Sequence, residues 1–541
     1  MAKRRNVLWI MADQLRWDYL SCYGHPHLMT PNLDALAERG VRFDRAYVQS
    51  PFCGPSRMCF YTGRYSRSHG ATWNGFPLRV GEPTLGDHLR PLGVRTAIVG
   101  KTHMIPDTEG MSWLGIDPKS SIGVNLAECG FEPYERDDGL HPYGPFDPDP
   151  DYDDYLRKNG FDSRNPWEDW ANSAEGDDGE ILSGWLLRYN NLPARIPEEY
   201  SETPYMTRRA MQFMDTAGDR HWCLHLSFIK PHWPYIVPAP YHDMYRSEHI
   251  LPAIRSDAER STDHPVFRAY QNTRICRAFA EERVRQRVIP AYMGLIKQLD
   301  DQMGMLFAFM ETRGLMDNTM IVFTSDHGDY LGDHWMGEKD LFHDQSVRVP
   351  LIVYDPRREA DVTRGTVSKA LVEGIDLAPT FLEFLGGGSK PHILEGRSLA
   401  PVLHTIGVPA QWRHYVISEY DYSTRYARVD LGIDANDARL IMICDNRWKY
   451  WHCEGFRPML FDLEADPQEL VDLGASPEHA DVRNQMHELI FGWARQHHTR
   501  ITRSPEQIER MSNKEPPGIL IGIWDETEFE KIFDKPYSQR P

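Results

Sequence analysis

The residue string that most strongly suggests chemistry is Cys53-Gly54-Pro55-Ser56-Arg57, followed by Thr62-Gly63. A lone cysteine is usually a small buried hydrophobe or a reactive thiol. Here Pro55 suits the first turn of a helix through residues 58–61, whose first amides would face an anion near Cys53. The planar guanidinium group of Arg57 can donate two hydrogen bonds to a ligand oxygen and offset the negative charge of that oxygen. The string therefore predicts a site for a tetrahedral oxyanion ester.

Four predicted strands end close to polar or charged residues. The strands cover residues 6–12, 95–99, 221–229 and 319–324, and they lead to Asp13, Lys101, His232 and Asp326. Any one of these residues alone would more often be a surface strand end. In open α/β sheets ligands bind beyond the carboxyl ends of the strands. We therefore expect the four side chains to meet in one crevice.

Helices are predicted between these strands, over residues 31–38, 84–92 and 290–312. Alternating strands and helices favour an α/β fold with a large, mostly parallel sheet sandwiched by helices. After Pro401 the apolar segments become shorter, at 415–418, 439–444 and 448–452, with a helix over 482–496. This part predicts a smaller α+β subdomain with an antiparallel sheet. We divide the chain at 1–405, 406–500 and a tail at 501–541 that could contact another subunit in a dimer or tetramer.

The Cys-x-Pro-Ser-Arg string with its Thr-Gly resembles the signature of type I sulfatases, in the alkaline phosphatase superfamily. In that family a maturation enzyme oxidises the cysteine to formylglycine, whose hydrated aldehyde is the nucleophile. The segments Leu460–Leu463 and Asp466-Pro467 resemble the carboxyl-terminal motif of the same family. The resemblance covers nearly the whole chain, and it implies an alkaline phosphatase-like catalytic domain over residues 1–405.

The resemblance also implies a set of site residues. One divalent metal ion, calcium or manganese, would be held by Asp13, Gln14, Asp326, His327 and the matured Cys53. Gly100-Lys101-Thr102-His103 resembles the sulfatase Gly-Lys-x-His element, and His103 would be the base that expels sulfate from the enzyme ester. His232 and Lys339 would bind the anionic oxygens and assist the leaving group. Read without the family, each of these residues is a strand-end cap, a turn residue or a solvated surface group.

Three functions remain open at this point. The first is an arylsulfatase-like hydrolase with promiscuity towards phosphonate monoesters and phosphodiesters. The second is a phosphonate monoester hydrolase or phosphodiesterase, which is suggested by Asn74 and by Pro231-His232-x-Pro234. Those hydrolases usually carry tyrosine and threonine where this chain has Lys101 and His103, so we favour the sulfatase. The third is a binding protein on an inactive hydrolase fold.

Composition restricts the partners and the location. The chain has 541 residues, 41% of them hydrophobic, and a formal net charge of −19, which argues against nucleic acid as a partner. Residues 107–180 hold twenty acidic and five basic residues, and we expect an acidic insertion of long surface loops at about 105–200.

No apolar run reaches the roughly 20 residues of a membrane helix. Lys3-Arg4-Arg5 imitates a secretory signal, but Asp13 interrupts the apolar run that follows it. Eight scattered cysteines without a Cys-x-x-Cys pair argue against a disulfide framework and against a zinc site, and reduced thiols fit the cytoplasm.

Overall fold

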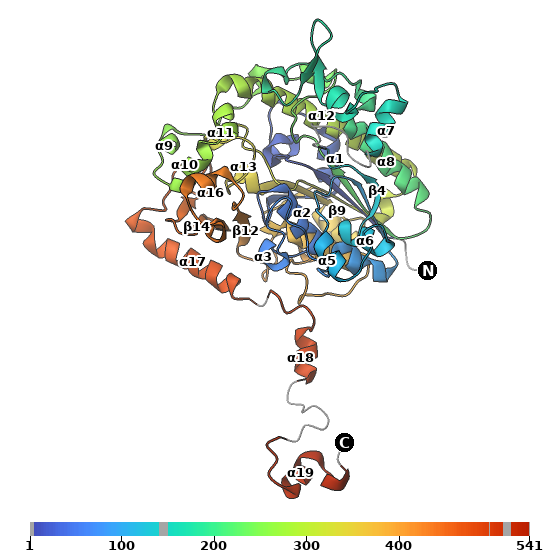
Figure 1. The fold of residues 1–541 in the computed structure, drawn as a ribbon, viewed down its shortest axis with the longest axis vertical. Helices are drawn as coiled ribbons and strands as arrows, with labels where there is room; N and C mark the ends of the chain where they lie inside the picture. Colours follow the sequence, from blue (N-terminus) through green and yellow to red (C-terminus); the bar gives the residue numbers. More distant parts are fainter. Residues whose placement is uncertain (1–4, 140–149, 497, 512–520, 540–541) are drawn as a thin grey trace.

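The computed structural model describes residues 5–139, 150–496, 498–511 and 521–539, and it is built around a nine-stranded sheet (Figure 1). The strand order is β10-β2-β9-β8-β1-β7-β3-β4, and β11 also pairs with β2. The strands are β1 (Asn6–Ala12), β2 (Val41–Tyr47), β3 (Arg95–Gly100), β4 (Glu132–Arg136), β7 (Trp222–Phe228), β8 (Thr319–Thr324), β9 (Arg348–Tyr354), β10 (Thr366–Ser368) and β11 (Val372–Glu373).

Helices surround this sheet, and one small helix pair forms part of the tail. They are α1 (Pro31–Arg39), α2 (Cys53–Thr62), α3 (Ser66–His69), α4 (Leu85–Leu89), α5 (Thr108–Trp113), α6 (Ser121–Ala127), α7 (Asp151–Lys158), α8 (Glu202–Thr216), α9 (Asp257–Arg260), α10 (Pro265–Gln271), α11 (Arg274–Phe279), α12 (Glu282–Thr312), α13 (Asp344–Val347), α14 (Leu377–Phe384), α15 (Ala400–Leu403), α16 (Tyr426–Leu431), α17 (Ala480–Ala494), α18 (Pro505–Met511) and α19 (Glu526–Phe533).

The four central strands β8, β1, β7 and β3 are parallel and adjacent. Every residue of β1 is buried, as expected for a strand covered on both faces. Its side chains alternate between two cores. Val7, Trp9 and Met11 pack towards α2, α4 and α14, whereas Leu8 and Ile10 pack towards α1, α8 and α12. The sheet with helices on both faces confirms the predicted α/β class. The exception to the parallel pattern lies at β9, which is antiparallel to both β2 and β8.

The long helix α12 begins earlier than the sequence predicted. We placed its start at Pro290, because proline favours the first turn of a helix. In the structure the helix begins at Glu282 and Pro290 lies inside it. The preceding turns are held by buried contacts of Arg285 and Val288. Tertiary packing therefore offsets the hydrogen bond that proline cannot donate.

The acidic stretch is more regular than the long loops that we expected. It contains α5, α6, α7 and strand β4, which extends the edge of the main sheet next to β3. Tyr152 and Trp167 of this stretch are fully buried and belong to the core. Their apolar contacts explain why this polar region folds onto the domain. Residues 140–149 of the stretch lie outside the described part of the chain.

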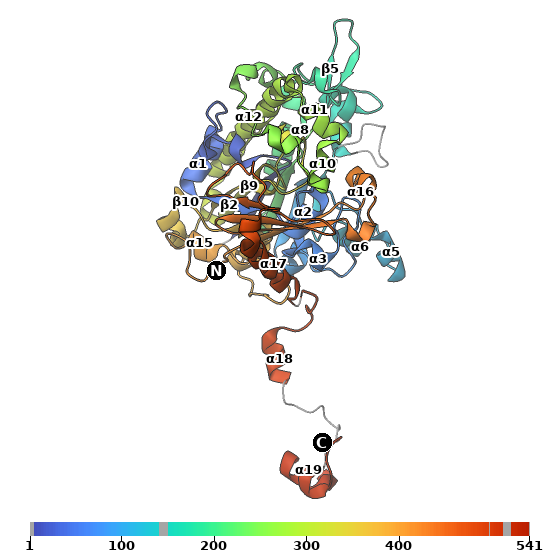
Figure 2. The same cartoon turned by 90° about the vertical axis from the view of Figure 1, so that its left-hand side faces the viewer.

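The carboxyl-terminal part forms the expected antiparallel sheet. Its four strands, in the order β12-β13-β14-β15, are β12 (Val416–Asp421), β13 (Arg439–Cys444), β14 (Trp448–Cys453) and β15 (Met459–Asp462). Helix α17 packs on this sheet through Met486, Ile490 and Trp493. Beyond it, α18 and α19 lead away from the body of the protein (Figures 1 and 2).

Two further expectations concern the cysteines and membrane-spanning helices. All eight cysteines are free, and seven of them are buried. Among the helices that the structure describes, none is long and apolar enough to cross a bilayer.

Candidate active site

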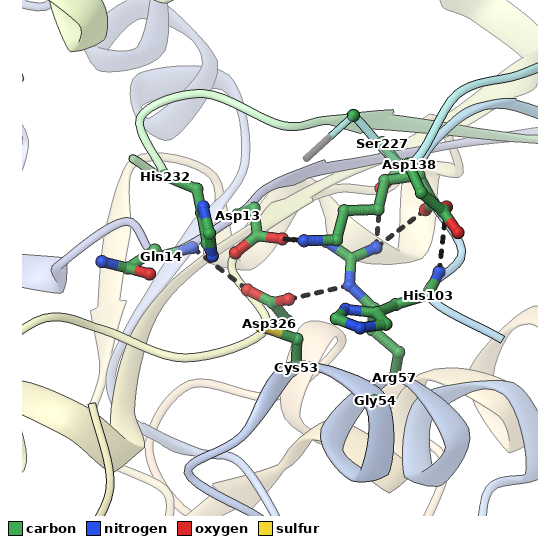
Figure 3. A network of polar contacts seen from close by, with 12 residues as sticks. Asp13, Gln14, Cys53, Gly54, Arg57, His103, Asp138, Ser227, His232 and Asp326 are labelled. Atoms are coloured by element: carbon green, nitrogen blue, oxygen red, sulfur yellow. Dashed lines mark hydrogen bonds and ion pairs between the residues drawn. The ribbon is translucent and has the colours of Figure 1, made fainter. Parts of the chain in front are cut away.

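The structure brings together the side chains that follow the four central strands, and Figure 3 labels three of them, Asp13, His232 and Asp326. Asp13 directly follows β1 and Lys101 directly follows β3, and the Lys101 Nζ atom lies 2.6 Å from Asp13 Oδ2. Asp326 follows β8 after one residue, and His232 lies in the loop that leaves β7. Because these strands are parallel neighbours, their carboxyl ends share one edge of the sheet.

Cys53 is the first residue of α2 and is buried. Gly54 follows it, and a Cβ atom at that position would lie 2.6 Å from Asn74 Oδ1. The close approach explains the glycine, because the Gly54 amide donates to Asn74 Oδ1 at 2.7 Å. We expected the first amides of this helix to face an anion. In the structure the Gly54 amide is bound to Asn74 instead, so Asn74 holds the start of the helix.

Arg57 joins the carboxylates of two different strand ends (Figure 3). Its Nε atom donates to Asp326 Oδ2 at 2.8 Å and its Nη2 atom to Asp13 Oδ2 at 3.1 Å. The remaining Nη1 atom donates to the Lys101 carbonyl and to Ser227 Oγ, both at 2.8 Å. The guanidinium group is fully buried. Arg57 therefore orients the acidic side chains and offsets their charge, as the sequence suggested for an oxygen ligand.

The environment of Cys53 favours an anion at the position of its sulfur atom. His327 Nε2 lies 3.0 Å from the Sγ atom. Burial raises the pKa of the Cys53 thiol, but the nearby Lys339, His327 and Lys101 together bring the pKa well below its ordinary value. If residue 53 were matured to the hydrated aldehyde, Sγ would stand in for one of its two hydroxyl oxygens.

Asp13, Cys53, Asp326 and His327 each offer a donor atom, and these atoms all lie within 4.8 Å of one another. Asp13 Oδ1 is buried without a hydrogen-bond partner among the described residues. Burial raises the pKa of Asp13, but Lys101, His232 and Arg57 outweigh burial and hold it below its usual range. An ionised carboxylate with one oxygen that accepts no hydrogen bond among the described residues, beside a second carboxylate and the His327 imidazole 3.7 Å away, fits a divalent cation.

Gln14, the other expected ligand, is oriented by its amide group. Its Nε2 atom donates to the Tyr235 hydroxyl at 3.0 Å and to Asp329 Oδ2 at 2.5 Å. Its Oε1 atom accepts from Lys339 Nζ at 3.0 Å. An amide oxygen has two lone pairs, so one remains for a cation.

His232 and Lys339 lie on the other side of this cluster. The Lys339 Nζ atom donates to His232 Nε2 at 3.1 Å, which leaves the proton of the imidazole on Nδ1 facing the Trp233 carbonyl at 2.8 Å. Burial and then the charge of Lys339 lower the pKa of His232 to about 4. The pair therefore consists of a charged lysine and a neutral histidine.

The backbone of His103 adopts a left-handed conformation, with φ of 54°, which is uncommon for a residue other than glycine. The Oδ1 atom of Asp138 accepts from the amides of Thr102 and His103, at 2.9 and 3.1 Å. The His103 Nδ1 atom is buried without a hydrogen-bond partner among the described residues. Its side chain is close enough to Cys53 to contribute to the lowered pKa of the thiol.

Several residues of the site were missed from the sequence. Asp138 belongs to an acidic stretch with many similar residues, and Ser227 lies inside the apolar strand β7. Tyr235 and Asp329 hold the Gln14 amide, and the Tyr235 hydroxyl also donates to Asp329 Oδ2. Asp329 lies two residues after His327. Its closeness in sequence to the expected ligands Asp326 and His327 is the one local indication that it belongs to the site. The others support neighbours that are distant in sequence, which no local pattern reveals.

Comparisons with known proteins agree with this arrangement. A model of the sulfatase family matches residues 5–387, and one described as N-sulphoglucosamine sulphohydrolase, C-terminal, matches residues 332–496. The multifunctional alkaline phosphatase superfamily protein PehA of Trinickia caryophylli is 31% identical over 522 residues, covering 91% of this chain and 96% of that protein. An arylsulfatase of Clostridium perfringens is 27% identical, covering 90% of this chain and 93% of its own.

Solved structures show the same relationship. The phosphonate monoester hydrolase of Silicibacter pomeroyi superimposes with a TM-score of 0.79 at 27% identity, covering 91% of this chain and 95% of that one. The phosphonate monoester hydrolase of Agrobacterium radiobacter gives a TM-score of 0.76 at 29% identity with the same coverage.

The sheet, its helices and the cluster at the strand ends define a hydrolase of the alkaline phosphatase-like class. The matched length of the family model and the identity to PehA decide the group within that class. The chain belongs to the sulfatase family of the alkaline phosphatase superfamily. The resemblance drawn from the Cys53 string is thereby confirmed, together with the predicted fold.

Proposed function

We propose that this protein hydrolyses sulfate monoesters, as an arylsulfatase does, with a formylglycine at position 53 as the nucleophile. The observation that carries the proposal is the position of Cys53. Its sulfur atom lies 3.0 Å from His327 in a buried cluster whose cationic side chains lower the thiol pKa. Lys101 and His103, the sulfatase residues of the Gly-Lys-x-His element, lie at this same site. A buried cluster of this kind is built to hold an anion and the negative charge of a transition state.

In the proposed reaction one hydroxyl of the hydrated formylglycine gives its proton to the neighbouring Asp326 carboxylate and attacks the sulfur atom in line, and the bond from sulfur to the alcohol oxygen breaks. Lys339, supported by His232, stabilises the departing oxygen and supplies its proton. The sulfate group is then an ester of the enzyme. His103 removes the proton from the second hydroxyl, the bond from carbon to the sulfate oxygen breaks, and sulfate leaves with the electron pair. The aldehyde that forms is hydrated again by water.

The cation that the site would bind is calcium or manganese, on the chemistry of its ligands. Asp13, Gln14, Asp326 and His327 would hold it, with the matured residue 53 completing the set. When bound, the ion would supply positive charge next to the sulfate oxygens and the nucleophile. Arg57 holds the Asp13 and Asp326 carboxylates in position for this role.

A second candidate is a phosphonate monoester hydrolase or phosphodiesterase with the same nucleophile. Two observations favour it: the similarity to two phosphonate monoester hydrolases over the whole fold, and the contact of Asn74 with the start of α2. We propose Asn74 as a residue that also binds substrate. Promiscuity between these ester classes is part of the proposal.

Rates with an aryl sulfate, phenyl phosphonate and an aryl phosphodiester on one purified sample separate the two candidates. We expect kcat/KM to be highest for the aryl sulfate, with measurable turnover of the other two. If the aryl sulfate is the poorest substrate by orders of magnitude, the protein is a phosphonate or phosphodiester hydrolase. A chain without turnover of any of them would support the remote alternative, a binding protein.

The proposal also covers the maturation, location and assembly of the protein. An external maturation enzyme would have to install the aldehyde. The free cysteines suit the cytoplasm. We retain the division at residues 405 and 500, and the homo-oligomer that the tail would stabilise. Ile521 and Trp524 of the tail are each 91% exposed, which suits contact with a second copy.

A further inference from the structure

A second cluster of metal-binding side chains lies outside the active site. It consists of Glu259 of α9, His334 of the turn η10 (Asp333–Trp335), and His343, which directly precedes α13. One donor atom from each residue lies within 4.8 Å of the others. Both histidines are fully buried and Glu259 is 7% exposed. The proposed reaction uses none of the three.

Each imidazole is held through its Nδ1 atom. His334 Nδ1 donates to Glu259 Oε1 at 2.6 Å, and His343 Nδ1 lies 2.9 Å from the Tyr330 hydroxyl. The Glu259 carboxylate is fixed in turn by the Ser256 amide, which donates to its Oε2 atom at 2.8 Å. The orientation of both rings is therefore set by groups around them.

The Nε2 atoms of both rings lack a partner. Each is buried, and neither has a hydrogen-bond partner among the residues that the structure describes. The rings stack with their centroids 3.8 Å apart and their planes within 15°. Two buried nitrogen atoms without partners in one place are costly, and such atoms in a native protein usually bind an ordered water molecule or an ion.

The arrangement matches the way in which proteins prepare histidine ligands. A metal-binding histidine normally donates its other N–H to a carboxylate or another oxygen, which fixes the tautomer and leaves one nitrogen for the metal. We propose that His334 Nε2 and His343 Nε2 bind a second metal ion of the zinc class, oriented by Glu259 and Tyr330. Imidazole ligands favour zinc over calcium or magnesium. Because stacked rings direct their lone pairs along nearly parallel lines, the two planes must tilt towards each other when the ion binds.

The position of this site suggests a structural role. His334 and His343 lie at the two ends of the segment that contains Lys339 of the active site. His343 also packs against Trp451 of β14 and Phe461 of β15, with ring centroids 4.7 and 5.6 Å away. An ion on the two histidines would tie the Lys339 segment together where it meets the carboxyl-terminal sheet.

The test uses the full chain with Asp326→Asn, which removes a ligand of the active-site cation. This protein is dialysed against Zn²⁺, and bound zinc is counted by elemental analysis. We expect the zinc count to fall by one ion per chain when His343→Phe is added, because any zinc held by Asp13, Cys53 and His327 is the same in both proteins. Phenylalanine suits the aromatic neighbours of His343, so the variant should fold. The matched control is His452→Phe on β14, which removes a partly exposed imidazole and should leave the zinc count unchanged.

Two further measurements support the count. Zn²⁺ should raise the unfolding temperature of the Asp326→Asn protein and of its His452→Phe derivative by the same amount, and that of the His343→Phe derivative by less. Glu259→Gln retains an acceptor oxygen for the cap but weakens the orientation of His334, so zinc affinity should fall about 10- to 100-fold. Equal zinc counts with and without His343, or no bound zinc in the Asp326→Asn protein, would overturn the proposal and leave water as the occupant.

Discussion

The substitution Arg57→Lys tests whether the planar guanidinium group of Arg57 holds the carboxylates of Asp13 and Asp326 in position. Lysine keeps the charge, but it presents three donors from a single atom instead of a planar fork. The four hydrogen bonds of Arg57 reach Asp13, Asp326, Ser227 and the Lys101 carbonyl at 2.8–3.1 Å. A lysine at this position can reach one or two of these groups. Because at least two buried hydrogen bonds are lost while the charge is kept, we expect the free energy of unfolding to fall by about 2–4 kcal/mol, from about 1–2 kcal/mol for each group left without its bond.

The assay is urea unfolding with a chelator present, together with kcat for an aryl sulfate in the presence of metal. Since the acidic side chains of the site lose their orientation, kcat should fall more than about tenfold, or ~1.4 kcal/mol of transition-state stabilisation. The matched control is Arg413→Lys. Arg413 is a buried arginine whose guanidinium contacts Asp376 and Glu373, away from the active site. This control should lose stability and keep its kcat. If Arg57→Lys loses less than about 1 kcal/mol and keeps wild-type kcat, the role given to Arg57 is wrong.

Three other predictions concern the base, the acid stability and the tail. His103→Ala should stop after the first step and accumulate sulfated enzyme, seen by intact mass; steady turnover without this species would contradict its role as base. Burial and then Arg64 lower the pKa of His69 to about 3, below the unfolded value of 6.5. The unfolded state therefore takes up the proton first, and stability should fall as pH falls from 6.5 towards 3. His69→Asn, which keeps the acceptor for the Ala71 amide, should reduce the loss between pH 7 and pH 5 in urea unfolding, and an unchanged loss would refute the assignment. Trp524→Ser should shift the full chain towards smaller species in light scattering, whereas an unchanged mass would exclude Trp524 from the subunit contact.

The sequence was informative where local chemistry and topology agree. The strands that lead to Asp13, Lys101 and Asp326 could be recognised because their apolar runs end abruptly at polar residues. Their meeting then followed from the parallel order of an α/β sheet. The Cys53 string indicated the start of a helix correctly, because glycine and proline have strong local preferences.

The remaining features depend on contacts between distant residues. Nothing near Asp138 in the sequence indicates that its carboxylate accepts from the amides of Thr102 and His103. The acidic stretch was misread as loops because its few buried aromatic residues, such as Tyr152 and Trp167, are outnumbered by charges. The start of α12 was misplaced because packing of Arg285 outweighs the local preference of Pro290.

The central claim is that residue 53 acts as an aldehyde, and peptide mass spectrometry tests it most directly. The protein should be produced together with a formylglycine-generating enzyme, and the peptide containing residue 53 measured. The account predicts a mass in which oxygen replaces the sulfur of Cys53 and two hydrogens are lost, in proportion to the specific activity of each preparation. Full activity in protein whose Cys53 is entirely unmodified would contradict it.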